Sequence, residues 1–360
     1  MAYNCFASCA FGLESLVSTE IKKLKLGGVN ARDARVYFDA DEIGIAAANL
    51  WLRTADRVFI ELGTFEATTF DMLFEGVRAL PLEDFIPRDA VFPVNADSVG
   101  STLFSVSDIQ SISKKAAVTR LMAAHKVSVL PETGSRYDIH VKILRNQVSV
   151  CLNTSGTGLN RRGFRAANVA APIRETLAAG LVMLSGWDGS GELCDPMCGS
   201  GTIAIEAAML GANIAPGLKR AFDAQNWPRF KKPWLAARDE AAQMKTQMPV
   251  IFASDIDKKA LSAADKNALA AGVGIKFFHA DVRNFSRTCP VLTNPPYAVR
   301  LGEKNEVHKL YGDMGKAFAA APKKSIITAD DDFERYFGKR ATKKRKLYNG
   351  SIRCNFYQYF

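Results

Sequence analysis

A strand, a glycine turn and a helix, encoded in that order after residue 191, constrain the fold of this 360-residue chain more than any other segment. Residues 192–195 are predicted to form a strand that ends at Asp195, and residues 202–210 a helix that begins at Thr202. Between them, Gly199-Ser200-Gly201 allows a tight turn that brings the backbone close to a ligand, in front of the helix amide groups. The segment predicts the first βα unit of a parallel α/β domain.

Further strands are predicted at 249–254, 276–280 and 291–293, and an acidic residue follows each of the first two. Asp255 is placed to accept both hydroxyls of a ribose, and Asp281 to accept the amino group of an adenine. Each acid could instead only cap the helix that follows it. Because Asp195, Asp255 and Asp281 come at successive strand ends, we favour a site for an adenosyl cofactor.

The motif Asn294-Pro295-Pro296-Tyr297 follows the fourth predicted strand. The amino group of an aromatic base is a poor nucleophile, because its lone pair is delocalised into the ring. The Asn294 side-chain oxygen and the Pro295 carbonyl can both accept from such a group and aim its lone pair at a methyl donor. Pro296 keeps the turn rigid, and Tyr297 offers a face on which an extruded base can stack. A proline-rich turn without a chemical role is the alternative, but after a cofactor motif we predict methyl transfer to an exocyclic nitrogen.

The chain divides into segments of different pattern. Short strands and helices fit a ferredoxin-like unit over residues 1–55, in which Gly27-Gly28 only ends a helix, and a second small α/β unit over 56–155, with a strand at 90–95. Residues 156–170 are predicted to be a linker, and residues 171–360 show a βαβ rhythm. Asn349-Gly350 marks a C-terminal hairpin. The predicted fold class is α/β, with a Rossmann-like parallel sheet closed by that antiparallel hairpin.

Basic residues exceed acidic ones, 47 Lys and Arg against 37 Asp and Glu, for a net charge of +10. Nucleic acid is the expected partner, although a basic surface can also serve solubility. Trp227, Phe230 and Trp234 lie among cations, a mixture that suits phosphate contact and base stacking. The cations of a helix predicted over 107–125 fit either a solvated face or a phosphate-facing stripe. The predicted nucleic-acid contacts are Arg161, Arg162, Arg165, Lys343, Lys344, Arg345 and Lys346.

Several classes of protein are not supported by the composition. No apolar stretch reaches the roughly 18 residues of a membrane span, and the N-terminus lacks the pattern of a signal peptide, so a cytoplasmic location is expected. The seven cysteines are scattered and are predicted to be reduced thiols. The four histidines show no zinc-ligand spacing from a cysteine pair, so no metal site is predicted.

These motifs resemble those of the bacterial THUMP-domain guanine-N2 methyltransferases that act on 23S ribosomal RNA of the large subunit. The resemblance rests on residues 159–165, 171–177, 195–207, 293–297 with 301–303, and 346–350. It implies a ferredoxin-like plus THUMP module that binds RNA, followed by a class I methyltransferase domain that uses S-adenosyl-L-methionine. The chain departs from the family at Asn160, Phe164 and Ala298-Val299, where the family usually has His, Tyr and Gly-Glu.

Site residues are carried over from the family only onto matching positions. Asn294, Pro295, Pro296 and Tyr297 would be catalytic and hold the guanine. The cofactor residues would be Asp195, Cys198, Gly199, Ser200, Gly201, Thr202, Asp255, Ile256, Asp281 and Asn294.

Three other functions stay open at this point. The chain could methylate guanine N2 in tRNA, because THUMP modules also serve tRNA enzymes, or adenine N6 in DNA, which uses the same Asn-Pro-Pro-Tyr chemistry. It could also be a non-catalytic RNA-binding factor of ribosome assembly. The sequence leaves open the modified nucleotide, the oligomeric state, and whether the substrate is naked RNA or an assembly intermediate.

Overall fold

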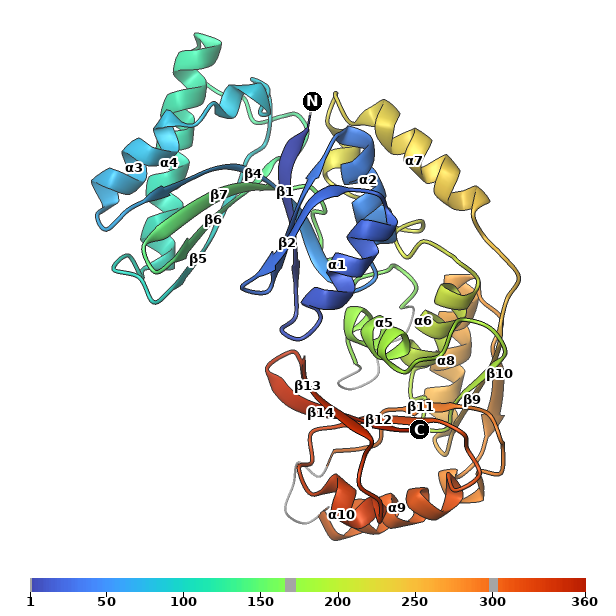
Figure 1. Ribbon diagram of the computed structural model, residues 1–360. Helices are drawn as coiled ribbons and strands as arrows, with labels where there is room; N and C mark the ends of the chain where they lie inside the picture. Colours follow the sequence, from blue (N-terminus) through green and yellow to red (C-terminus); the bar gives the residue numbers. More distant parts are fainter. Residues whose placement is uncertain (1, 166–172, 298–303) are drawn as a thin grey trace.

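Two seven-stranded sheets, one in each half of the chain, form the framework of the molecule (Figure 1). The structure is a computed structural model that describes residues 2–165, 173–297 and 304–360. In Figure 1 the N-terminal sheet lies above the C-terminal one, and the C-terminal hairpin rises toward the end of the first strand. The predicted α/β class, with small α/β units followed by a parallel sheet that an antiparallel hairpin closes, is confirmed.

The N-terminal sheet is continuous across both small α/β units, in the order β2-β3-β1-β4-β7-β6-β5. Strand β4 makes it continuous, because it pairs with β1 on one side and with β7 on the other. The strands are β1 (Tyr3–Cys9), β2 (Gly27–Arg32), β3 (Arg35–Ala40), β4 (Ala55–Glu66), β5 (Val94–Val99), β6 (Asp138–Leu144) and β7 (Gln147–Asn153). The helices are α1 (Glu14–Lys23), α2 (Glu42–Trp51), α3 (Phe70–Ala79) and α4 (Val106–His125).

Side chains alternate between the two faces of this sheet, as the period of a strand requires. Cys5, Val58 and Val150 belong to the main core, which these strands share with residues of helices α1 to α4. Their neighbours Phe6 and Phe59 point to the opposite face and form a small separate cluster. One face of the sheet, which is antiparallel apart from the parallel pair β5–β6, is therefore packed against helices.

The C-terminal sheet has the order β10-β9-β8-β11-β12-β14-β13. Strands β8 to β12 pair in parallel, and β14 is antiparallel to both of its neighbours, so the predicted C-terminal hairpin is present. The strands are β8 (Glu192–Asp195), β9 (Val250–Asp255), β10 (Lys276–His279), β11 (Val291–Thr293), β12 (Lys324–Thr328), β13 (Lys343–Asn349) and β14 (Ile352–Tyr359). The helices are α5 (Glu175–Leu184), α6 (Thr202–Gly211), α7 (Lys231–Gln243), α8 (Lys258–Ala271), α9 (Lys304–Ala317) and α10 (Phe333–Phe337).

Several local predictions were wrong. Gly27-Gly28 does not merely end a helix, because β2 begins at Gly27 and pairs with β3. The strand predicted at 90–95 begins only at Val94, where pairing with β6 starts. The helix predicted from residue 171 begins at Glu175 in the structure, and its predicted first residues lie outside the described part of the chain.

The aromatic residues inserted between α6 and β9 are core residues. Trp227 and Trp234 are each 2% exposed, and Trp227 stacks on Tyr137 with 4.4 Å between ring centroids. The Trp227 Nε1 donates to the Arg136 carbonyl at 2.7 Å. In Figure 1, α7 of this insertion lies against α2 of the N-terminal half. The prediction that these rings stack on bases is therefore wrong, since they join the two halves of the molecule.

Candidate active site

A cavity of about 680 Å³ opens at the carboxyl ends of β8, β9, β10 and β11. The order of the strands reverses between β8 and β11, and ligands of open α/β sheets bind at such a switch point. Nearly all predicted cofactor and catalytic residues line this cavity. They are Asp195, Cys198, Gly199, Ser200, Thr202, Asp255, Ile256, Asp281, Asn294, Pro295, Pro296 and Tyr297.

The glycine turn forms one wall of the cavity. Gly199 has a φ of +54°, and a Cβ placed there would have no atom within 4 Å, so the backbone is open to a ligand. Asp255 holds the turn, since its Oδ2 accepts from the Gly199 N–H at 2.8 Å. Gly201 is not among the lining residues, and a Cβ there would lie 3.0 Å from the Cβ of Ala264 on α8. Its role in the structure is the close packing of α6 against α8.

Asp195 is buried at the end of β8 and only half satisfied. Its Oδ1 accepts from the Thr293 hydroxyl at 2.8 Å, whereas its Oδ2 has no hydrogen-bond partner among the described residues. Burial raises the pKa of this carboxyl to about 7, and the negative charge of Asp255 acts in the same direction. Within the described part of the chain, no cationic side chain forms an ion pair with Asp195. Such a group suits a ligand that brings N–H donors or a positive charge.

The tetrapeptide 294–297 forms the wall that leads out from β11. The Oδ1 of Asn294 is screened from solvent and has no hydrogen-bond partner among the described residues. Tyr311 of α9, which is fully buried, holds the loop by donating from its hydroxyl to the Pro296 carbonyl at 2.9 Å. The sequence reasoning missed Tyr311, because nothing in its spacing from the motif signals this contact.

The two other strand-end acids differ in how they are held. Asp281 forms an ion pair with Arg283 and accepts from the backbone N–H of Arg283 at 2.9 Å. The hydrogen bond from Arg283 lowers the pKa of Asp281. The Asp255 carboxylate accepts from two backbone N–H groups, those of Gly199 and Asp257. Both acids therefore have a local structural role in addition to their place in the cavity wall.

The C-terminal hairpin contributes residues that the sequence reasoning did not assign to the site. Asn349 and Ile352, on either side of the hairpin turn, line the cavity together with Ile173 and Leu310. Asn349-Gly350 predicts the hairpin itself, but nothing in its local sequence signals that the turn of the hairpin reaches the cavity. The departures at Ala298-Val299 lie outside the described residues.

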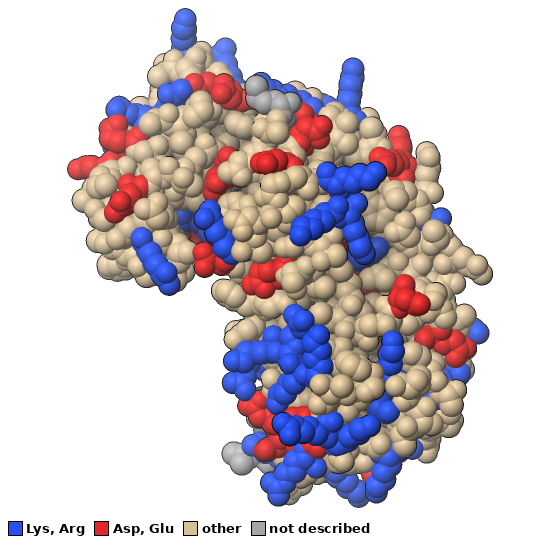
Figure 2. Space-filling model, in the orientation of Figure 1, with Lys and Arg blue, Asp and Glu red and all other residues tan. Residues whose placement is uncertain are grey.

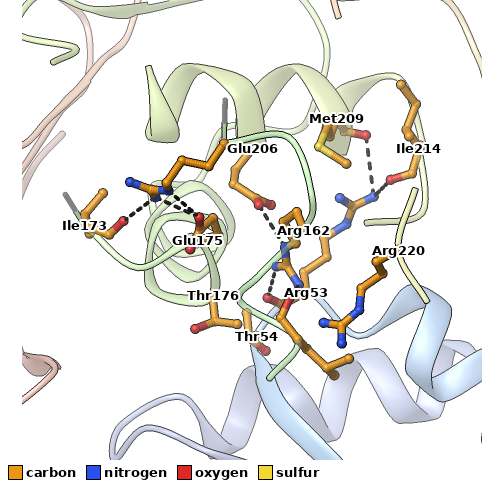
Figure 3. A network of polar contacts seen from close by, with 12 residues as sticks. Arg53, Thr54, Arg162, Ile173, Glu175, Thr176, Glu206, Met209, Ile214 and Arg220 are labelled. Atoms are coloured by element: carbon orange, nitrogen blue, oxygen red, sulfur yellow. Dashed lines mark hydrogen bonds and ion pairs between the residues drawn. The ribbon is translucent and has the colours of Figure 1, made fainter. Parts of the chain in front are cut away.

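Arg162 and Arg165 are engaged in ion pairs. Arg162 is 3% exposed, and its Nε donates at 3.0 Å to Oε1 of Glu206, a residue of α6 (Figure 3). Arg165 pairs with Glu175 at 2.7 Å. The predicted RNA contact is therefore wrong for Arg162, because burial and an ion pair leave no free donor face for a phosphate. Arg165 is partly exposed but already paired, and Arg161 is exposed.

Arg53 of the N-terminal half joins the same network, which Figure 3 shows between the two halves of the molecule. Its guanidinium donates to the Met209 carbonyl, in the last turn of α6, at 3.5 Å. It also donates to the Ile214 carbonyl, just beyond the end of α6, at 2.7 Å. Arg162 in turn donates to the Arg53 carbonyl. The N-terminal module is thus attached to the helix whose first turn lines the cavity.

The basic run 343–346 forms most of strand β13. Lys343, Lys344 and Lys346 are exposed and Arg345 is half-buried, and Lys and Arg side chains gather over this hairpin in Figure 2. Because side chains alternate along a strand, Lys344 and Lys346 point to the face opposite Lys343 and Arg345. Lys344 also lies 3.7 Å from Glu334 of α10. The run is therefore divided between two faces, and its predicted RNA contacts stay predictions.

Two further features of the described residues bear on the class of site. No three His, Cys, Asp or Glu side chains are grouped so that they could hold a metal ion. Among the helices that are described, none has both the length and the apolar character needed to cross a lipid bilayer.

Residues 162–358 match the family model described as RMKL-like, methyltransferase domain. Residues 4–59 match an RlmL ferredoxin-like domain, and residues 67–153 a THUMP domain. The chain therefore belongs to the RMKL-like methyltransferase family. Along the chain, the ferredoxin-like domain comes first, the THUMP domain second and the methyltransferase domain third.

Two relatives illustrate the range of the family. The chain is 42% identical to the Bacillus subtilis protein named "Putative RNA methyltransferase YpsC", over 99% of this chain and 96% of that one. It is 30% identical to the Ribosomal RNA large subunit methyltransferase K/L of Cellvibrio japonicus, over 98% of this chain but only 50% of the relative. The chain thus spans about half the length of the K/L protein.

Solved structures agree with the fold over the whole chain. The crystal structure of SMU.472 complexed with SAH has a TM-score of 0.94 and 39% identity, and the alignment covers 100% of this chain and 98% of that one. A predicted N6-adenine-specific DNA methylase from Listeria monocytogenes has a TM-score of 0.94 and 43% identity, with 100% and 96% covered.

Proposed function

We propose that this chain is an RNA methyltransferase that transfers a methyl group from S-adenosyl-L-methionine to the exocyclic N2 of a guanine in 23S ribosomal RNA. One observation carries the proposal. Two buried acceptor atoms, Asp195 Oδ2 and Asn294 Oδ1, belong to residues of the same cavity and have no partner among the described residues. A buried acceptor without a partner is costly, so both atoms suit N–H groups that ligands bring.

The cavity has the donor and acceptor groups that an adenosyl cofactor requires. Asp195 would hold the ammonium group, and the open backbone at Gly199 would let the ligand approach closely. Asp255 would accept from the ribose, since each carboxylate oxygen has a lone pair beyond the one used for Gly199 or Asp257. Asp281 would take the adenine amino group. The bound cofactor supplies an electrophilic methyl group.

The tetrapeptide would orient the acceptor base. Asn294 Oδ1 and the Pro295 carbonyl accept from the exocyclic amino group and aim its lone pair into the cavity. The Tyr311 hydroxyl holds the Pro296 carbonyl by a hydrogen bond. The loop that carries the acceptors of Asn294 and Pro295 is therefore fixed before the base arrives. Tyr297, half-buried at the rim, offers a ring face to the base. The nitrogen becomes acidic once it is alkylated, so no general base is needed before attack.

RNA is favoured as the substrate class by the N-terminal half. The THUMP match, the basic balance of the chain and the names of its relatives support RNA, and those of the K/L relatives support large-subunit rRNA. The acceptor chemistry alone also fits adenine N6, and the similar Listeria protein is named for that reaction on DNA. The two functions therefore differ in the nucleic acid and in the base that is methylated, whereas the residues of the cavity fit both.

The test is transfer of labelled methyl from S-adenosyl-L-methionine to unmodified 23S rRNA, tRNA and DNA, followed by analysis of the nucleosides. Label in N2-methylguanosine from the 23S rRNA is the expected result. Label in tRNA would keep the chemistry and change the substrate, and label in N6-methyladenosine or in DNA would overturn the proposed base. A ribosome assembly intermediate belongs in the same assay, because naked RNA can lack the structure that exposes the target.

A further inference from the structure

The face of the N-terminal sheet that the helices leave uncovered is a second surface with unassigned chemistry. Phe6 of β1 and Phe59 of β4 stack there with 4.9 Å between their centroids, and Tyr37 of β3 lies 5.5 Å from Phe6. These rings and Cys151 form a cluster apart from the helix-packed core. None of the described helices contributes a residue to this cluster.

Cations, and not helices, cover these rings. The guanidinium of Arg32 lies 4.5 Å from the centroid of Tyr37, and that of Arg35 lies 5.0 Å from the centroid of Phe6. The Lys142 ammonium lies 4.7 Å from the centroid of Phe59. A guanidinium that lies over a ring in a cation–π contact keeps its outer side and its edge donors available to a ligand.

Charge on this face is divided between its two ends. Arg35 and Arg57 both lie opposite Ser8, near the carboxyl end of β1. Asp39 lies opposite Asn4 at the other end, where Asn4 also donates to Glu61 at 2.9 Å. The face is therefore basic where β1 ends and acidic where it begins.

The basic end is short of counter-charge. In the described part of the chain, neither Arg32, Arg35 nor Arg57 forms an ion pair. Lys142 reaches Asp97 only at 4.0 Å. Burial lowers the pKa of Lys142, and the charges of Arg35 and Arg57 act in the same direction. Cations that repel one another on an open surface are stabilised by an anionic ligand.

The basic end lies beside the C-terminal hairpin. A Cβ added at Gly12, just beyond β1, would lie 3.1 Å from both the Leu347 side chain and the Lys346 carbonyl on β13. The turn of the same hairpin brings Asn349 and Ile352 to the wall of the cavity. A chain bound at Arg35 could therefore continue along the hairpin to the active site.

We propose that the basic end of this uncovered face, centred on Arg32, Arg35 and Arg57, binds the phosphates of a single-stranded RNA segment next to the target guanine. The inference rests on the proposed function. Phe6 and Phe59 are buried beneath these cations, so a ligand meets the guanidinium groups and not the rings. This arrangement suits a single strand, whose bases can stack on the guanidinium planes while its phosphates take the edge donors. A duplex could not bring its bases to these planes.

The cations on the helix side of the same sheet supply the contrast. Lys114 is paired with Glu132 at 2.8 Å, and Arg120 is paired with Glu83. They fit the solvated-face interpretation of α4. Exposed cations of this side, Lys22 on α1 and Lys115 on α4, can therefore be removed as a control with equal loss of charge.

The test compares the variant Arg32→Ala/Arg35→Ala with the control Lys22→Ala/Lys115→Ala in fluorescence anisotropy with a single-stranded RNA of roughly ten nucleotides. At about 0.1 M salt, the arginine variant should lose about tenfold in affinity, and its slope of log K against log salt should fall by roughly 1.4, or 0.7 for each lost phosphate contact. The control should change less than about twofold. SAH affinity should be equal in both variants, which reports an intact fold.

Three results would overturn the inference. They are equal RNA affinity in the two variants, a loss confined to duplex RNA, and an equal loss for inorganic polyphosphate of the same length, which would indicate a general anion surface. If Arg32→Ala/Arg35→Ala fails to fold, the single change Arg32→Gln at the exposed position takes its place, with half of the slope change expected. Because binding is measured without turnover, a chain that binds RNA here but methylates another base would refute only the proposed function.

Discussion

Two buried carboxyl groups, Glu206 and Asp195, have similar hydrogen bonds but different roles in the molecule. Each has one oxygen with a hydrogen bond, from Arg162 to Glu206 and from Thr293 to Asp195, and one oxygen with none among the described residues. Burial raises the pKa of both groups. They differ in counter-charge. The positive charges of Arg162 and Arg53 oppose the effect of burial at Glu206, whereas the charge that acts on Asp195 is that of another acid, Asp255.

The difference indicates which buried charge belongs to the fold and which to the ligand site. Glu206 is neutralised by the protein itself, at the junction between the N-terminal module and α6 (Figure 3). Asp195 lies in the wall of a cavity, and its charge has no ion-pair partner within the described ranges. A buried acid in that state is a candidate to bind a cationic ligand.

The largest expected effect is on the structural side of the comparison. Arg162→Ala should lower the free energy of unfolding by about 3–5 kcal/mol, because it leaves Glu206 buried without its ion-pair partner, with only the more distant charge of Arg53 opposing burial. Denaturant unfolding followed by circular dichroism measures this. The variant Arg162→Met/Glu206→Leu should recover much of the loss, since the pair is replaced by apolar side chains. A loss below about 1 kcal/mol for Arg162→Ala would mean that water reaches Glu206 and the pair is not structural.

The ligand side of the comparison is tested by pH. The pKa of Asp195 is raised from 3.8 to about 7, so the stability that the protonated group contributes is fully present below pH 3.8 and is lost as the pH rises through 7. An ammonium group on a ligand favours the ionised carboxylate. Affinity for S-adenosyl-L-methionine should therefore rise about tenfold from pH ~6 to pH ~8 in calorimetric titrations. The variant Asp195→Asn should bind more weakly and without this dependence; an unchanged pH profile would contradict the assignment.

A smaller effect is expected where a buried group acts through another residue. Tyr311→Phe removes the hydrogen bond to the Pro296 carbonyl and should cost about 1 kcal/mol of stability. If the hydroxyl positions the loop, the transfer rate should fall by up to about tenfold while SAH affinity stays constant. A loss of stability with an unchanged rate would limit Tyr311 to a structural role.

The smallest effect is expected beside the ion pair. Arg161 is exposed next to buried Arg162, so Arg161→Ala should change the free energy of unfolding by no more than about 0.5 kcal/mol. It is the matched control for Arg162→Ala. A loss of unfolding free energy as large as that of Arg162→Ala would contradict the assignment of Arg162, and not Arg161, to the buried network with Glu206. RNA affinity of the same variant tests the RNA contact predicted for Arg161.

The fold and the cavity could be predicted because their signals are local. A glycine turn between a strand and a helix fixes where β8 and α6 meet, and parallel strands bring Asp195, Asp255 and Asn294 to one edge without further information. The C-terminal hairpin was equally readable from Asn349-Gly350. These predictions needed only periodicity and the direction of the strands.

Side-chain direction could not be predicted where it depends on distant partners. Arg162 and Lys343 both stand in basic segments, but Arg162 faces Glu206, which lies 44 positions along the chain, and Lys343 faces solvent. Trp227 is buried because Tyr137 meets it from the other half of the molecule. Composition reports which groups are present, whereas tertiary packing decides which of them remain available to RNA.

The most direct test of the account is a side-by-side measurement of SAH affinity and single-turnover methyl transfer for Asn294→Ala and Asp195→Asn. The account predicts that Asn294→Ala binds SAH almost as the unmodified protein does but transfers about 10²- to 10³-fold more slowly, since one positioned acceptor is lost. Asp195→Asn should lose affinity first and transfer at a near-normal rate when the cofactor is saturating. Equal losses of affinity and rate in both variants would contradict the division of the cavity into a cofactor side and a base side.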